Sequence, residues 1–277
     1  MSIMKEVMEA GEILNRMREK NPLIHNITNV VVTNFTANGL LAIGASPVMA
    51  YAKEEVADMA VASDALVLNI GTLTKENVES MIIAGKAANK GNTPVVLDPV
   101  GAGATAYRTE SVQKILNEVK ISLMRGNAAE VAAVSGMQAE IKGVDAVGLT
   151  EDVVAIAKAA SKKIQAPVVI TGKKDVVANG DIVYLIANGH PLLTKVTGAG
   201  CLLSSVLAAF IAVEKDVVKA CAAGLAAYGV AAEMAAEQGG KEGPGSFQIQ
   251  LLNKLAQVNK EDILKMARIE KEGEFAI

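Results

Sequence analysis

Two glycines stand directly before an apolar helical stretch in the run Gly198-Ala199-Gly200-Cys201. A turn of this kind lets backbone N–H groups approach an anion without interference from a Cβ atom, and the start of the following helix adds partial positive charge. The run therefore indicates a phosphate-binding turn. An ordinary glycine turn that enters a core helix, with Cys201 as a small buried side chain, is the alternative.

A carboxylate ends another apolar run, Pro94-Val-Val-Leu-Asp98, directly before Pro99. A charged side chain has no packing role at the end of a buried strand, so Asp98 is well placed to bind Mg²⁺ directly or through water. A simple turn before the proline explains the same residue equally well.

Polar residues also end two further apolar runs, at Arg125 and at Thr171. Arg125 could donate charge-assisted hydrogen bonds to a nucleotide phosphate. Asn127 and Glu130 have the spacing of a helix capping box, which would explain that pair by structure alone but would not explain Arg125. For Thr171, a nucleotide contact and a plain turn both remain open.

Several familiar signatures do not occur in the sequence. It has no Walker A pattern, no complete Gly-x-Gly-x-x-Gly and no Gly-x-Ser-x-Gly elbow, which disfavours P-loop, Rossmann dinucleotide and serine-hydrolase sites. His25 and His190 are too far apart to form a zinc-ligand motif.

Short apolar runs alternate with longer helical patterns as far as Thr171, beginning with a helix over residues 3–20. The expected strands are Leu23–Thr28, Ser46–Ala50, Ala65–Gly71, Pro94–Asp98, Ile121–Met124 and Pro167–Thr171. The expected helices are Val30–Ala42, Lys53–Met59, Thr74–Lys90, Ser111–Val119, Ala128–Val134 and Glu151–Lys163. Nearly continuous Val, Ile and Leu in the strands indicate a parallel sheet with helices on both faces.

The pattern changes after Thr171. Two β-rich runs joined by Asn179-Gly180 predict a hairpin, which would add an antiparallel edge to the sheet. From Gly200 onward the sequence is almost wholly helical. We therefore expect one three-layer α/β domain over residues 1–277, with a mostly parallel central sheet.

In such a sheet the carboxyl ends of the parallel strands meet at one edge, where ligands bind. The candidate residues would then gather an Asp, an Arg, an Asn, a Glu, a Thr and a glycine-rich turn on one rim. That set suits phosphoryl transfer, which depends on positioning and charge neutralisation more than on covalent chemistry.

The composition argues against nucleic acid and membrane as the main partners. Lys plus Arg number 27 against 30 Asp plus Glu, so the chain lacks the excess of positive charge that binds a nucleic-acid backbone. There is also no Trp, and few aromatic rings are available to stack on bases. No uninterrupted apolar run approaches the roughly 18 residues of a membrane span. Two cysteines and no secretion-type N-terminal pattern favour a cytoplasmic protein without disulfides.

Taken together and in order, six motifs resemble those of the hydroxyethylthiazole kinase family, within the ribokinase-like superfamily. They are His25-Asn-Ile-Thr-Asn29, Gly44-Ala-Ser-Pro-Val-Met-Ala50, Asn69-Ile-Gly-Thr-Leu73, Asp98-Pro-Val-Gly-Ala-Gly103, Arg125-Gly-Asn-Ala-Ala-Glu130 and Val196-Thr-Gly-Ala-Gly-Cys201. The resemblance implies a ribokinase-like fold and ATP-dependent phosphorylation of the primary alcohol of 4-methyl-5-(2-hydroxyethyl)thiazole, in thiamine salvage. It also implies a homotrimer with the thiazole bound between subunits.

The resemblance assigns the acceptor side of the site to Met49 and Gly198, with Asn29 beside them, and the catalytic turn to Gly200 and Cys201. Many relatives in the superfamily have an aspartate at the last position, where it acts as the base. A free thiol with a pKa near 8.5 is mostly protonated at neutral pH, although a helix N-terminus lowers that value, so Cys201 is a candidate for a modest base. It could instead only shape the pocket.

The same resemblance places ATP against Arg125, Thr171 and Asn127, and makes Asp98 and Glu130 the Mg²⁺ pair, acting mostly through waters. Three rival functions remain at this stage: a sibling kinase for a hydroxymethylpyrimidine, a nucleotide-dependent hydro-lyase of the same fold, and a nucleotide-binding sensor without catalysis.

Overall fold

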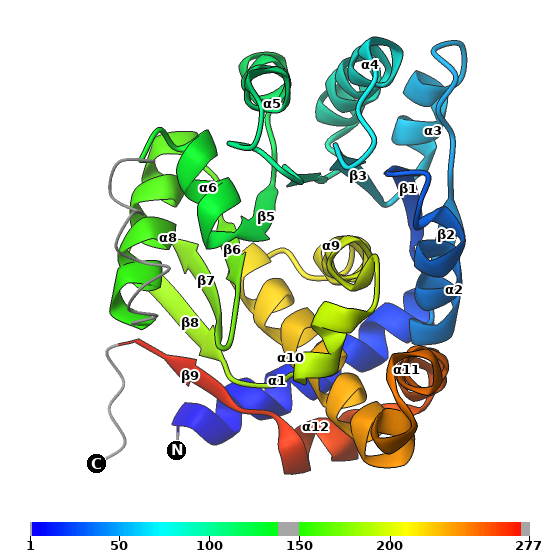
Figure 1. Ribbon diagram of the computed structural model, residues 1–277, viewed down its shortest axis with the longest axis vertical. Helices are drawn as coiled ribbons and strands as arrows, with labels where there is room; N and C mark the ends of the chain where they lie inside the picture. The colour runs from blue at the N-terminus through cyan, green and yellow to red at the C-terminus, as the bar shows by residue number, and fades with distance from the viewer. Residues whose placement is uncertain (1, 138–149, 273–277) are drawn as a thin grey trace.

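A nine-stranded sheet runs through the computed structural model of the chain, which describes residues 2–137 and 150–272 (Figure 1). The strand order is β2-β1-β3-β4-β5-β6-β7-β8-β9. The strands are β1 (Leu23–Ile27), β2 (Ser46–Val48), β3 (Ala65–Asn69), β4 (Val95–Asp98), β5 (Leu123–Asn127), β6 (Val168–Thr171), β7 (Asp175–Asn179), β8 (Ile182–Ile186) and β9 (Ile269–Lys271). The strands from β2 to β6 pair in parallel, and the last three pairings are antiparallel.

Helices cover both faces of the sheet, as expected (Figure 1). One face is covered by α3 (Val56–Ala62), α4 (Lys75–Gly91), α5 (Ala106–Glu118), α6 (Ala128–Val134) and α8 (Thr150–Ile164). The other is covered by α1 (Ser2–Lys20), α2 (Thr33–Ile43), α9 (Ala199–Ile211), α10 (Val217–Gly239), α11 (Pro244–Gln257) and α12 (Lys260–Met266). Two 3₁₀ turns, η2 (Pro191–Lys195) and η3 (Gly240–Glu242), complete the described elements. The expected three-layer fold is confirmed.

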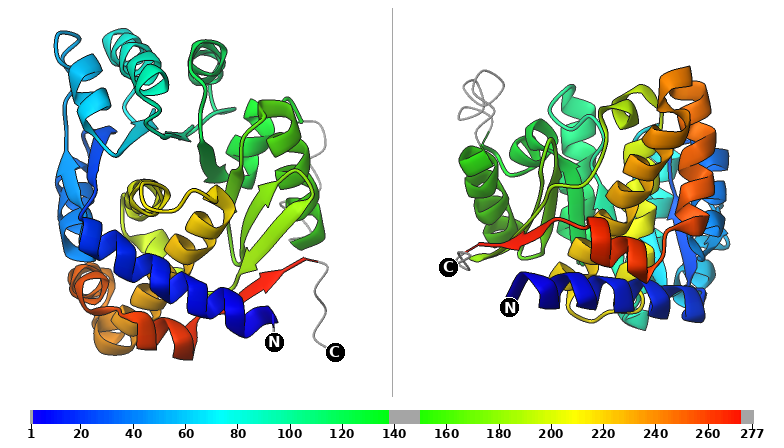
Figure 2. Two further views of the ribbon diagram at one scale, coloured as in Figure 1. Left: turned by 180° about the vertical axis from the view of Figure 1, so that it is seen from behind. Right: turned by 90° about the horizontal axis from the view of Figure 1, so that it is seen from below.

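The two helical layers explain why the parallel strands are apolar throughout. In β3 all five residues are buried, and its side chains alternate between the two cores: Val67 lies on the face that contacts α9, whereas Leu66 and Leu68 pack on the opposite face. Figure 2 shows α1 passing across the layer that contains α9 and α10, where it contacts α10, α12 and β9.

The differences from the expected elements include two shifted boundaries and one additional strand. Strand β5 extends to Asn127, because it pairs with β6 as far as Thr171, so Arg125 lies within the strand rather than after it. Helix α5 begins at Ala106, five residues before the expected start, because the Thr105 side chain caps it by accepting from a backbone N–H. Strand β9 was missed, because its three residues are mostly polar and follow a long helical region.

The predicted hairpin is confirmed, with a shift of one residue in its turn. Asn179 still pairs with Ile182, so the two linking residues are Gly180 and Asp181. Gly180 has φ +59°, a left-handed conformation that glycine adopts without a Cβ penalty.

The segment Val217–Glu242, which includes α10, is long and apolar enough to cross a membrane by length and composition. However, 78% of its apolar window is buried inside the protein. Its small residues let it pack closely against α1, α9 and α11, so it is a core helix.

Candidate active site

Asp98 lies at the centre of the rim, as the last residue of β4, and its side chain is fully buried. Its Oδ2 accepts hydrogen bonds from Asn69 Nδ2 at 2.9 Å and from Ser204 Oγ at 2.7 Å, and Arg125 Nη1 lies 3.6 Å away. Its Oδ1 is buried without a partner among the described residues. One carboxylate oxygen is therefore held by the protein and the other is available.

Burial raises the pKa of Asp98 to about 6, although Arg125 and the Ser204 hydroxyl favour the ionised form. The nearby Glu130 carboxylate adds to the rise. A carboxylate in this position is costly to ionise in the protein alone, and a neighbouring cation would remove that cost.

Arg125 joins three parts of the rim. Its Nη2 donates to Thr171 Oγ1 at 2.7 Å, and its Nη1 faces Asp98. Gly200 packs directly on the guanidinium, because a Cβ at that position would lie 2.8 Å from Nη1. The Nε atom is buried without a partner within the described chain. The arginine thus brings together the ends of β4 and β6 and the glycine turn.

The capping box at α6 is present. Asn127 Oδ1 accepts from the Glu130 N–H at 2.9 Å, and Glu130 Oε2 accepts from the Asn127 N–H at 2.8 Å. Glu130 Oε1 also accepts from the Gly101 N–H at 2.9 Å, which ties the loop after β4 to α6. The Asn127 side chain has its amide nitrogen left for a ligand. Each Glu130 oxygen accepts one backbone N–H and keeps a second lone pair, so the structural role and a site role are compatible.

The donor set fits a hydrated Mg²⁺ better than a fully protein-bound metal. No cluster of three or more metal-binding side chains exists among residues 2–137 and 150–272. Asp98 offers one unpartnered oxygen, and the Glu130 carboxylate is near enough to raise the pKa of Asp98. Mg²⁺ commonly keeps several waters and uses one or two carboxylates together with substrate phosphates.

The glycine turn opens α9. Gly198 has φ +87°, and a Cβ there would lie 2.4 Å from Val32, so only glycine allows α9 to start against the chain entering α2. The N–H groups of Gly200 and Cys201 lie in the first turn of α9, where a helix has no internal acceptors for them. Tyr228 supports the turn by donating its hydroxyl to Ala199 O at 2.9 Å.

Cys201 lies beside Asp98 and receives two amide hydrogen bonds. Asn29 Nδ2 donates to its Sγ at 3.2 Å, and Asn69 also hydrogen-bonds it. Burial, followed by the Asp98 carboxylate, nevertheless raises the pKa of Cys201 to about 11. Burial therefore outweighs the lowering effect of the helix N-terminus, and the thiol stays protonated at neutral pH.

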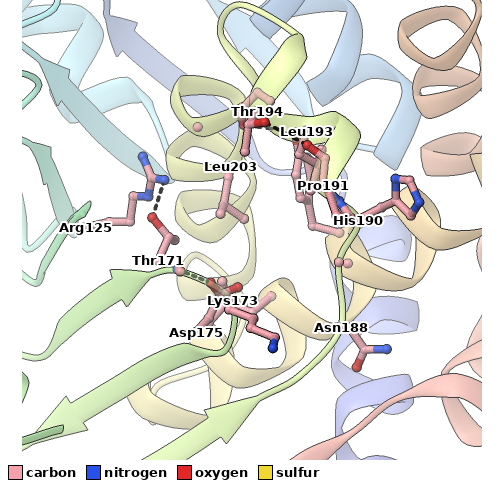
Figure 3. A pocket seen from close by; sticks show the side chains of 17 residues that line it. Arg125, Thr171, Lys173, Asp175, Asn188, His190, Pro191, Leu193, Thr194 and Leu203 are labelled. Carbon is pink, nitrogen blue, oxygen red and sulfur yellow. Dashed lines mark hydrogen bonds between the residues drawn. The ribbon is translucent and has the colours of Figure 1, made fainter. Parts of the chain in front are cut away.

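A pocket of about 710 Å³ extends from Arg125 and Thr171 along α9 to the chain after β8 (Figure 3). Asn188 and His190 lie at its far end. Tyr228 contributes to its wall. Its size is that of a small-molecule site. The glycine turn borders it, since Ala199 and Gly200 are among its lining residues.

The far end of this pocket was missed by the sequence analysis, although the signal was present. Two antiparallel pairings in succession make β8 run parallel to β6. The turn Asn188-Gly189-His190 after β8 therefore lies on the same rim as Thr171. Polar residues and a glycine directly past the end of a strand are the same signal that indicated Asp98 and Thr171.

The remaining two site candidates lie toward β2. Asn29 follows β1, and its Oδ1 is buried without a partner in the described chain, next to Cys201. Met49 is half-buried and directly follows β2, at the edge of the sheet. The structure thus groups nine of the ten candidate residues around Asp98 and the glycine turn, and leaves Met49 at the sheet edge.

Arg108, on α5, was also missed. Its Nη1 donates to Ile70 O at 2.9 Å and Val100 O at 2.6 Å, and its Nη2 donates to Gly71 O at 3.0 Å. The guanidinium therefore ties together the loops that follow β3 and β4, on either side of Asp98.

We expect Arg108→Lys to lower the free energy of unfolding by about 2 kcal/mol and to lower kcat about tenfold. The reason is that one ammonium group cannot donate to all three carbonyl oxygens that the planar guanidinium binds. Urea unfolding and steady-state kinetics would measure both. The control is Arg16→Lys, in an exposed ion pair with Glu214, which should change little. Equal behaviour of the two variants would show that Arg108 does not organise the rim.

A mostly parallel sheet with an antiparallel edge thus carries a glycine turn that opens a helix, with an arginine between that turn and a buried carboxylate. The fold is shared with an ADP complex of Bacillus subtilis pyridoxal kinase (18% identity, 76% of this chain and 91% of that chain, TM-score 0.59). It is also shared with a ribokinase-like superfamily protein from Enterococcus faecalis V583 (11% identity, 86% and 87%, TM-score 0.63). These two likenesses show the fold alone.

A solved structure with higher sequence identity, together with a family model, identifies the family. The structure of a hydroxyethylthiazole kinase protein from Pyrococcus horikoshii OT3 is 41% identical, covers 95% of this chain and 98% of that chain, and has a TM-score of 0.87. The sequence model of the hydroxyethylthiazole kinase family matches residues 14–261. The chain belongs to the hydroxyethylthiazole kinase family. It is a kinase that transfers phosphate to an alcohol, and the family implies ATP as the donor and a place in thiamine salvage.

Proposed function

We propose that this chain transfers the γ-phosphate of ATP to the primary hydroxyl of 4-methyl-5-(2-hydroxyethyl)thiazole at the rim between Asp98 and the Gly200–Cys201 turn. The observation that carries the proposal is the position of Arg125. Its guanidinium stands where the large pocket meets the glycine turn, Thr171 and the buried carboxylate.

The pocket beyond Arg125 would hold the nucleotide, with the base toward Asn188 and His190 and the phosphates toward the turn. Arg125 retains a buried Nε without a partner in the described chain, and the first N–H groups of α9 need acceptors. A triphosphate supplies oxygen acceptors for both. Asn127 would add a contact from its amide nitrogen.

Asp98 and Glu130 would hold Mg²⁺ at the junction of nucleotide and acceptor, largely through waters. When bound, the ion neutralises charge on the phosphates. Asp98 would contribute its free Oδ1, while Asn69 and Ser204 retain the other oxygen.

The acceptor alcohol would lie on the Cys201 side of the rim. Asn29 Oδ1 can accept a hydrogen bond from its hydroxyl and orient it toward the phosphate, and Gly198 leaves room beside the turn. A protonated Cys201 shapes this end of the site without acting as a strong base at neutral pH. A loose transition state for phosphoryl transfer requires little base assistance.

Replacing Cys201 by aspartate should preserve or raise kcat at pH 7. The two amides of Asn29 and Asn69 that face the sulfur would donate to the new carboxylate, which is ionised at pH 7 and can accept a proton, unlike the protonated thiol. Cys221→Ala removes the other buried thiol, on α10, and serves as the control. A folded Cys201→Asp protein without turnover would show that the shape of the thiol matters more than the presence of an ionised proton acceptor.

We also propose that the chain forms a homotrimer, with the thiazole site completed by a neighbouring subunit near Met49. Strand β2 is a sheet edge, and exposed apolar side chains lie at the start and end of the adjacent α2 region: Val30 is 67% exposed, Val31 69% and Leu41 60%. Such side chains are expected at a subunit contact. Light scattering after gel filtration should give three chains per particle, and a monomer with full activity would contradict this.

Each subunit would then act as a single catalytic domain over residues 1–277. Its setting would be the cytoplasm, where the two free cysteines, one in the site and one in the core, stay reduced.

An acceptor panel tests the proposed substrate. Incubation with ATP and Mg²⁺ should convert the thiazole alcohol to its phosphate ester, identified by mass, in preference to a hydroxymethylpyrimidine. Phosphorylation of the pyrimidine alone would favour the sibling kinase. Nucleotide binding without an ester from any alcohol would favour the hydro-lyase or the sensor.

A further inference from the structure

All the donors around Asp98 converge on one oxygen. Asn69 and Ser204 donate to Oδ2, Arg125 approaches the same atom, and Oδ1 is buried without a partner in the described chain. A buried oxygen left in this state costs free energy unless a ligand uses it. The asymmetry therefore indicates that the protein keeps Oδ1 for something it binds.

The orientation of the Asn69 amide is determined by the backbone. Its Oδ1 accepts from the Gly71 N–H at 2.9 Å, so the NH₂ group must point the other way. One of its hydrogens serves Asp98 Oδ2, and the same side chain hydrogen-bonds Cys201. The amide is almost fully buried and connects the acceptor side of the site to the carboxylate.

Ser204 makes the corresponding connection from α9. It lies one helical turn after Gly200 and is fully buried. Its hydroxyl donates to Asp98 Oδ2 at 2.7 Å, a shorter contact than the 3.4 Å to the Gly200 carbonyl. The helix that presents the glycine turn is therefore joined directly to the carboxylate on β4.

We propose that Asn69 and Ser204 are positioning residues that fix the Asp98 carboxylate with Oδ1 free for a hydrated divalent cation. They also hold that oxygen at a set distance from the glycine turn and from Cys201. This inference rests on the proposed role of Asp98 as a metal-binding residue.

Helix α9 offers a matched control in the next residue. Ser205 is also fully buried, also makes a 3.4 Å contact to the carbonyl four residues earlier, and donates to Asn26 Oδ1 at 2.7 Å, away from Asp98. Ser205→Ala therefore removes the same kind of buried hydrogen bond as Ser204→Ala without touching the carboxylate.

The test is a Mn²⁺ titration of full-length protein saturated with ADP, in which electron paramagnetic resonance measures free Mn²⁺ against a nucleotide-only blank. Ser204→Ala and Asn69→Ala should each raise the Kd for Mn²⁺ about ten- to hundredfold, the usual effect of removing a residue that orients a metal ligand. Ser205→Ala should bind Mn²⁺ as the wild type does. The Kd for ADP, measured without metal, should be unchanged in all three.

Asp98→Asn separates failure of this inference from failure of the proposed metal site. If Asp98→Asn weakens Mn²⁺ binding while Ser204→Ala and Asn69→Ala do not, the positioning role is wrong and the metal site stands. If Asp98→Asn itself binds Mn²⁺ normally, both are overturned. Thermal unfolding checks that each variant is folded. If Asn69→Ala does not fold, the Mn²⁺ affinity of Ser204→Ala alone tests the positioning role.

Discussion

Asp98→Asn should lower kcat/KM about a hundred- to a thousandfold, while the fold remains intact. The asparagine has the same size and can still accept from Asn69 and Ser204, but it lacks the negative charge that the proposed Mg²⁺ requires. The expected loss is therefore electrostatic and should appear mainly in kcat.

The thermal stability of this variant should not fall together with its activity. Burial raises the pKa of Asp98 to about 6, above the value of an exposed aspartate, so ionisation at neutral pH destabilises the folded chain relative to the protonated form. Removing the charge should leave the thermal unfolding midpoint unchanged or raise it at pH 7. Steady-state kinetics and calorimetry on one preparation measure both quantities.

Glu130→Ala provides the comparison for the second carboxylate. It should also lower Mg²⁺-dependent turnover, and it should destabilise the chain, because it removes the capping box and the bond to Gly101. Full activity in both Asp98→Asn and Glu130→Ala would show that the metal assignment is wrong.

Gly200→Ala should lower kcat at least about a hundredfold, by displacing the guanidinium on which the proposed site depends. The new Cβ would lie 2.8 Å from Arg125 Nη1 and 3.1 Å from Nη2. A long side chain often moves away from such a contact, but this one is held by Thr171 and faces Asp98. To avoid the new Cβ, the guanidinium must lose its hydrogen bond to Thr171 or move away from Asp98.

The stability of Gly200→Ala should change little, because the helix gains up to about 1 kcal/mol from alanine and the displaced arginine offsets it. Gly245→Ala is the control, since a Cβ at that position of α11 would meet nothing within 4 Å. Activity equal to the wild type in Gly200→Ala would mean that Arg125 does not work from its observed position.

The parts of the site that depend on local sequence were predictable. A capping box needs only two residues three apart, and Asn127 and Glu130 form one. Nearly continuous apolar runs also predicted the parallel strands, because both faces of the sheet are covered. The rule that ligands gather past the carboxyl ends then placed Asp98 and Thr171 on one rim.

The parts that depend on contacts between distant segments were not predictable in the same way. Ser204 and Asp98 are 106 residues apart in the sequence, and Arg108 and Ile70 in the loop after β3 are 38 apart. No local spacing pattern in the sequence therefore indicates either hydrogen bond. The pKa of Cys201 also depends on tertiary structure, since burial and Asp98 outweigh the start of the helix.

The central claim is transfer of phosphate from ATP to an alcohol at the rim of Asp98, Arg125 and Gly200, and a single-turnover experiment tests it most directly. With enzyme in excess over ATP and the thiazole alcohol present, we predict one phosphate ester for each ADP formed, and slow formation of both in Asp98→Asn and Gly200→Ala. Without the alcohol, ADP should hardly form. ADP without ester, or an ester formed at the wild-type rate by both variants, would contradict the claim.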